Sequence, residues 1–211
     1  NTLVGLPLDL AAINIARGRS EGIPRLNEVR DQFYAATQDG AVAPYANWYE
    51  FGLNLKHVES LVNFVAAYGK GPCDLGGATS IVDRRAAASE LVLGTTVADQ
   101  ACMFGDAATS GVDDVDFWVG GLAERQAVFG GLLGSTFNYV FESQLEDLQN
   151  GDRFYYLQRL DGVHLRTILE SNSFTELIRR NSDSGATMDK VFATADFRFD
   201  LSSPPFNTGA T

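Results

Sequence analysis

The sequence predicts a mainly α-helical fold with irregular loops and little strand. Several stretches carry apolar residues three and four positions apart, which is the spacing of one face of a helix. Residues that commonly begin or end helices stand at the boundaries of these stretches. Alternation of apolar and polar residues, which is typical of a strand, appears in one short run at residues 191–201.

Local sequence signals mark the boundaries of several predicted helices. The first begins at residue 8 and ends before the glycine-isoleucine-proline turn at 22–24, because glycine and proline interrupt helices. Ser80 and Ser135 are of the type that accepts backbone N–H groups at a helix start, and Gly69 is of the type that follows a helix end. The later predicted helices are 26–37, 58–68, 81–93, 135–150, 165–171 and 174–180, and residues 39–52 are predicted as loop.

Composition and charge exclude some classes of protein. The 211 residues suit one domain or part of a larger one, and 45% hydrophobic with 20% charged residues is ordinary for a globular protein. No stretch approaches the roughly 18 consecutive apolar residues that span a membrane. The formal net charge of −11 argues against a nucleic-acid partner, because binding phosphates requires clustered Lys and Arg. The N-terminal residues also lack the basic-then-apolar pattern of a signal peptide.

Cysteine and histidine are scarce. Cys73 and Cys102 lie in one irregular stretch, and they could form a disulfide or remain as buried thiols. Their spacing fits neither a zinc site nor a redox motif. His57 and His164 have no second ligand at a metal-binding spacing, so we predict structural roles for both and no metal site.

One helical face organises the N-terminal stretch 8–30. Leu10, Ile13, Asn14 and Arg17 fall at positions i, i+3, i+4 and i+7 and share this face. An amide and a guanidinium that face an interior need partners, because an unpaired buried polar group costs about 1–3 kcal/mol. The face suits a flat, mostly apolar ligand with an anionic edge. Alternatively, the two polar side chains bind neighbouring carbonyls and carboxylates in a plain helical core.

The motif around this face resembles the signature of the animal-type haem peroxidase superfamily, which is peroxidase- and cyclooxygenase-like. The run LDLAAINIARGR at 8–19 is followed by GIP at 22–24 and then by Asn27 and Arg30. The family usually has Asp-His where residues 20–21 are Ser-Glu, so the match is looser just after the helix.

The resemblance implies roles for the four residues of the face. Asn14 would accept the ring N–H of the proximal His, which makes it the candidate catalytic residue. Arg17 would lie near the haem propionates, and Leu10 with Ile13 would form the haem wall.

A second block, at residues 112–124, resembles the acidic Asp-Asp-x-Asp-x-Trp run of the same superfamily and continues into residues 130–137. The resemblance implies scaffold on the far side of the haem domain, with no chemistry. From the residues alone, Asp113, Asp114 and Asp116 could form a calcium loop, but the central glycine of such loops is missing. We therefore favour solvated or capping aspartates.

The resemblance covers residues 3–180 and implies the C-terminal part of a peroxidase catalytic domain. Residues 70–111 would be an insertion, of a kind associated with large secreted bacterial relatives. Residues 181–211 are predicted to be an extended tail or linker. The implied location is secreted or extracellular, and bacterial.

The implied function is part of a haem peroxidase that uses hydrogen peroxide to oxidise small donors, whether organic compounds, halide or Mn(II). This chain would supply the helix on the proximal side of haem b. The axial His, the distal His and Arg, and a calcium loop would come from the remainder of the same polypeptide, upstream, so the fragment alone is expected to be inactive.

Two other functions remain open from the sequence. The first is a non-catalytic peroxidase-fold domain of a large secreted adhesion or matrix protein. The second is a free-standing helical module that binds a partner through residues 70–111.

Overall fold

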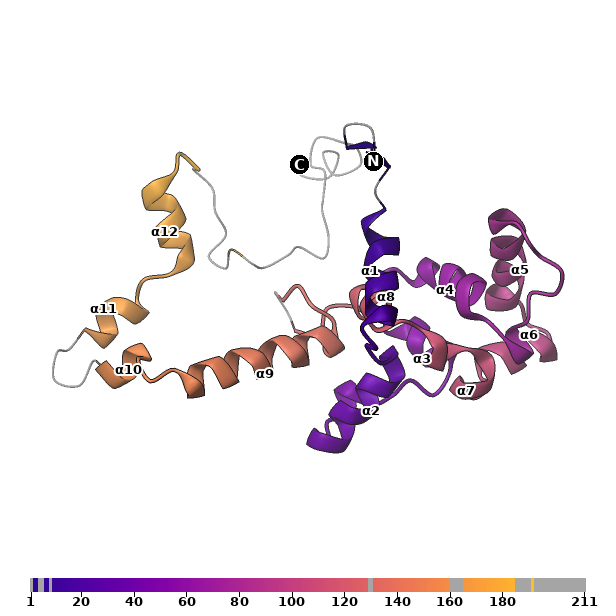
Figure 1. Cartoon of the computed structure of the whole chain (residues 1–211), viewed down its shortest axis with the longest axis horizontal. Helices are drawn as coiled ribbons and strands as arrows, with labels where there is room; N and C mark the ends of the chain where they lie inside the picture. Colours follow the sequence, from indigo (N-terminus) through magenta and orange to yellow (C-terminus); the bar gives the residue numbers. More distant parts are fainter. Residues whose placement is uncertain are drawn as a thin grey trace, which may run out of the picture. The chain divides into compact units, whose positions relative to one another are not determined.

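Helices make up nearly all of the regular structure in the computed structural model, as the sequence predicts (Figure 1). The structure describes residues 2–3, 6–7, 9–128, 131–159, 165–184 and 191. Strands β1 (Thr2–Leu3) and β2 (Leu6–Pro7) form a two-residue antiparallel pair. Contacts divide the chain into two units, one of residues 1–127 with 133–147 and one of residues 128–132 with 148–211.

The core of the first unit lies between α2 (Leu26–Thr37), α3 (Trp48–Leu53) and α4 (Leu61–Tyr68). Aromatic rings dominate it. Trp48 and Phe51 are fully buried, and Phe51 packs edge-on against Phe64 with 5.0 Å between ring centroids. The indole N–H of Trp48 donates to the carbonyl of Ser110 at 3.0 Å, so this large side chain is satisfied as well as buried.

Helix α1 (Leu10–Ser20) begins two residues after the predicted start, because its cap residue Asp9 accepts the backbone N–H of Ala12 at 3.1 Å. None of its residues is buried, and it packs against α8 (Phe117–Ala123). Gly120 of α8 faces the core, where an added Cβ would lie 2.7 Å from a methyl group of Leu26. Glycine at this position allows α8 and α2 to approach closely.

Residues 70–111 form a helical segment that contributes buried side chains to the core of the first unit. It contains η3 (Gly71–Cys73), α5 (Ile81–Leu93), α6 (Val97–Met103) and α7 (Ala107–Ser110). Cys73 and Cys102 are disulfide-bonded, which decides the alternative that the sequence left open. The two ends of this segment lie close together, since the N–H of Lys70 donates to the carbonyl of Ser110 at 3.2 Å.

Several short helices were not predicted, among them α3, α6 and α8. Residues 39–52, expected as loop, contain η1 (Gly40–Val42) and the start of α3, whose first turn is capped by Asn47. Helix α6 begins at a capping box, in which Thr96 and Asp99 bind each other's backbone N–H groups. The predicted helix at 58–68 is divided into η2 (Val58–Ser60) and α4.

Helix α9 (Ser135–Gly151) starts in the first unit and ends in the second. Its apolar stripe is present but largely uncovered, with Val140, Phe141 and Leu145 exposed. Within the second unit, Ser173 caps α12, because it accepts the N–H of Glu176 at 3.2 Å. The remaining helices are α10 (Tyr156–Arg159), α11 (Arg166–Glu170) and α12 (Phe174–Asn181), and the short η4 (Val112–Asp114) precedes α8.

Several predicted features lie outside the described residues: His164, the alternating run beyond residue 191 and the linker at its end. Among the helices that the structure describes, none combines the length and apolar character needed to cross a membrane.

Candidate functional site

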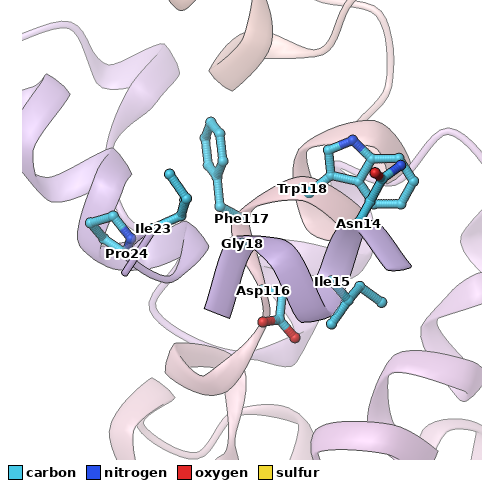
Figure 2. A pocket seen from close by; sticks show the side chains of 8 residues that line it. All are labelled: Asn14, Ile15, Gly18, Ile23, Pro24, Asp116, Phe117 and Trp118. Carbon is cyan, nitrogen blue, oxygen red and sulfur yellow. The ribbon is translucent and has the colours of Figure 1, made fainter. Parts of the chain in front are cut away.

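Helix α1 is attached to the first unit through one side. Ile15 and Gly18 border a cavity of about 260 Å³ between α1 and the start of α8. Figure 2 shows Asn14 and Trp118 at one end of this cavity and Ile23 and Pro24 at the other. The cavity is lined mainly by apolar side chains, and the amide of Asn14 is one of its few polar groups.

The predicted ligand face of α1 is the neighbouring, more open side. Of its four residues only Asn14 borders the cavity, while Leu10 is 68% exposed, Ile13 is half-buried and Arg17 is exposed. Neither the amide of Asn14 nor the guanidinium of Arg17 bonds to any other side chain or carbonyl in the described part of the chain. The alternative of a plain core with satisfied polar groups is therefore wrong, because no residue of this face is buried and its two polar groups have no such partners.

Arg19, two residues further on, is held firmly. Its Nε and Nη2 donate to the two carboxylate oxygens of Asp116 at 2.9 and 2.6 Å. Tyr68 donates its hydroxyl to the same carboxylate at 2.6 Å. Because it is paired in this way, the pKa of the Arg19 guanidinium is raised, and hydrogen bonds from Arg19 hold the pKa of Asp116 below its usual range. Burial, aided by the hydrogen bond to Asp116, raises the pKa of Tyr68 to about 12.

Sequence reasoning missed Arg19 and gave the 112–124 block no part in the site. In the structure, Asp116 of the block binds α1 directly. The available signal was the pair of cations flanking Gly18. Only one of these two cations could share the ligand face, so the other was the candidate for an ion pair with an acidic residue elsewhere in the chain.

The carboxylates of the three aspartates of the block bind side chains, and none of them caps a helix. Asp113 accepts a hydrogen bond from the amide of Asn27 at 2.7 Å, and Asp114 pairs with Arg25 and Lys70. The expectation of solvated or capping aspartates is therefore wrong, because their oxygens join separate segments of the first unit. Within the described ranges, no group of three or more His, Cys, Asp or Glu side chains is placed to hold a metal ion.

A buried ion pair forms the second polar centre of this unit. Arg30 and Glu124 lie 3.0 Å apart, with side chains only 3% and 1% exposed. Tyr45 and Thr136 both donate hydroxyl hydrogen bonds to Glu124, at 2.9 and 2.6 Å. Burial, with the neighbouring carboxylate of Glu124, raises the pKa of Tyr45. The guanidinium of Arg30 also donates to Ser135 and to the carbonyls of Ala41 and Ala43.

Comparison with known proteins agrees with the motifs. The family model described as animal haem peroxidase matches residues 104–193. Peroxidasin of Drosophila melanogaster is 30% identical over 155 residues, which are 74% of this chain and 7% of that protein. Peroxinectin A of Dictyostelium discoideum is 26% identical over 200 residues, which are 91% of this chain and 27% of that protein.

The chain belongs to the animal haem peroxidase superfamily. Peroxidase skpo-1 of Caenorhabditis elegans is 57% identical over a shorter stretch of 44 residues, which are 21% of this chain and 7% of that protein. The match to each of these three relatives covers 27% or less of the relative's length. No solved structure gives a significant match.

The residues of α1 fit the cofactor that the superfamily implies. A haem combines a flat apolar ring with carboxylate groups at one edge. The open face offers the exposed side chain of Leu10 and the half-buried side chain of Ile13, and beside them the unbonded polar groups of Asn14 and Arg17. His57 does not border the cavity, and its side chain is 66% exposed near Glu59.

The carboxylate of Asp116 makes part of the stability depend on pH. Its pKa is lowered in the folded state, so its contribution is full above the unfolded-state value of about 3.9 and is lost as the pH falls through the folded-state pKa. We expect wild type to be more stable than Asp116→Asn by about 1 kcal/mol or less at pH 7, because Arg19 stays largely exposed. Urea unfolding at a series of pH values should show this difference disappearing below pH ~4. A difference that does not change with pH would contradict the assignment.

Proposed function

We propose that this chain is part of a haem peroxidase that uses hydrogen peroxide to oxidise small donors, with α1 lining the proximal side of the haem. The observation that supports this most is the contrast within α1. Arg19 is paired, whereas Asn14 and Arg17 present unbonded polar groups on an open face that also carries Leu10. Such a face suits a ligand that is mainly apolar and carries an anionic edge.

Each residue of the face has a distinct proposed role. Asn14 accepts the ring N–H of the axial His and so orients that imidazole and increases its basicity. Arg17 binds a propionate through charge-assisted hydrogen bonds. Leu10 and Ile13 exclude water from the ring. When bound, the haem supplies the redox chemistry, in which peroxide is reduced to water by two electrons taken from the donor.

The remaining parts of the site belong to the same longer polypeptide in this proposal. The axial His, the distal acid–base groups and a calcium loop are supplied upstream, and the donor is an organic compound, halide or Mn(II). A secreted location is supported by the fully buried disulfide between Cys73 and Cys102, because such bonds persist in oxidising compartments.

Removing the amide of Asn14 tests the axial role. In the intact protein, Asn14→Ala should raise the ferric/ferrous potential by tens of millivolts, because an imidazole that loses its acceptor donates less electron density and stabilises the ferric state less. Potentiometric titration with optical detection measures this shift. A potential equal to that of wild type would contradict the role of Asn14.

Removing the cation of Arg17 tests the propionate contact. We expect Arg17→Ala to lose haem faster than wild type, roughly tenfold or more, since a hydrogen bond to a charged group contributes about 1.5–3 kcal/mol. Haem transfer to an excess of apomyoglobin measures the rate. Arg85→Ala is the matched control, because Arg85 is an exposed cation on α5, away from α1. Equal rates in all three proteins would exclude the contact, and full haem retention without peroxidase turnover would favour the non-catalytic alternative.

A further inference from the structure

The carboxylate of Asp116 receives three hydrogen bonds from two different helices. Two come from Arg19 on α1 and the third comes from Tyr68, the last residue of α4. The Asp116 side chain is only 14% exposed, although Arg19 is mostly exposed. A carboxylate that binds both a guanidinium and a phenol hydroxyl has little rotational freedom. It therefore fixes the position of the Arg19 guanidinium.

The segment that carries Asp116 and the helix that ends at Tyr68 are both anchored in the core. On one side, the backbone of Asp116 forms a bridge with Arg25, and the N–H of Leu26 donates to Val115 at 2.9 Å. On the other side, Tyr68 ends a helix whose Phe64 and Val65 are buried. The junction after Tyr68 is tight, because an added Cβ at Gly111 would lie 2.1 Å from the Tyr68 carbonyl.

Helix α1 has few other attachments, since none of its residues is buried. Successive residues of an α-helix are rotated by about 100°, so residues two apart point in nearly opposite directions. Fixing Arg19 on the side of Asp116 therefore turns Arg17 to the far side of the helix. Asn14, three residues before Arg17, lies within about 60° of it, at the edge between that far side and the cavity beside α8, and it turns with Arg17.

We propose that Asp116 is a positioning residue which, together with Tyr68, grips Arg19 and thereby fixes the rotation of α1 so that Asn14 and Arg17 face the haem. The identity of the ligand rests on the proposed function, but the grip on α1 does not. The acidic block at 112–124 thus has a positioning role, which its resemblance to a scaffold segment did not suggest.

Amide hydrogen exchange of α1 in the intact protein tests the grip. We expect residues 13–20 to exchange roughly fivefold faster in Asp116→Asn than in wild type. The control is Asp114→Asn, which removes an ion-paired carboxylate of the same block whose partners Arg25 and Lys70 lie outside α1. The swapped variant Arg19→Asp with Asp116→Arg should restore slow exchange. Equal exchange in Asp116→Asn and wild type overturns the proposal.

The ferric/ferrous potential provides the functional readout. If Asp116 positions Asn14, Asp116→Asn should shift the potential in the same direction as Asn14→Ala, and the swapped variant should reverse the shift. Another outcome is exchange that is fast in Asp116→Asn and slow again in the swapped variant while the potential does not shift. That result supports the grip on α1 and counts against the haem-facing role of the helix. A shifted potential with unchanged exchange overturns the grip.

Discussion

Glu124→Ala is expected to lower the free energy of unfolding by about 3–5 kcal/mol, far more than the loss of an exposed ion pair would. The change leaves the guanidinium of Arg30 buried without its counter-ion. It also removes the acceptor for the hydroxyls of Tyr45 and Thr136 and for the backbone N–H of Thr136. Removing one member of a buried pair costs much more than the pair itself contributes, because the remaining charge loses both water and partner.

Urea unfolding followed by circular dichroism measures this loss. The matched control is Glu170→Ala, which breaks an exposed pair with Arg166 on α11 and should change stability by no more than about 0.5 kcal/mol. Arg30 also contacts the ring of Tyr45 at 4.0 Å, so near-ultraviolet dichroism of the aromatic residues should change in Glu124→Ala. A loss of stability as small as that of the control would show that the buried pair does not hold this unit together.

Removing the disulfide is expected to cost about 3–4 kcal/mol. The two cysteines are 29 residues apart, and the loop that they close restricts the unfolded chain in the usual entropic account. Both side chains are fully buried between η3 and α6, so the double substitution Cys73→Ala with Cys102→Ala adds the loss of their packing. Helices α5 and α6 should lose protection from hydrogen exchange before α2 does.

Adding a reductant distinguishes the contribution of the disulfide bond to stability from that of side-chain packing. Wild type should lose stability in dithiothreitol, whereas the double alanine variant should be insensitive to it. If both proteins unfold at the same urea concentration with and without dithiothreitol, the disulfide contributes nothing to the stability of residues 70–111.

Local signals in the sequence account for much of the helical architecture. The bounds of α2 and α5 follow from apolar stripes, and the start of α5 follows from Ser80, which accepts the N–H of Asp83. Helix α6 carried an equally local signal in its capping box but lay in a stretch poor in large apolar residues. Helix α3 is short, and its burial depends on core partners that the sequence does not place.

The polar centres were harder to foresee, because their members are far apart in the chain. Arg30 and Glu124 are separated by 94 positions, and Arg19 and Asp116 by 97. Periodicity identified the open face of α1 but could not decide which cation would be paired. Arg17 and Arg19 differ only in the direction that each takes from the helix, and that direction depends on where Asp116 lies.

The central claim is that the open face of α1 meets a haem, and a distance measurement on the intact, haem-loaded protein tests it most directly. A nitroxide spin label attached at Ser20→Cys, on α1, is compared with one at Ala86→Cys, on an exposed position of α5. The claim predicts that the ferric iron strongly accelerates the relaxation of the label on α1 and affects the label on α5 far less. Equal relaxation of the two labels, or a stronger effect on α5, would contradict it.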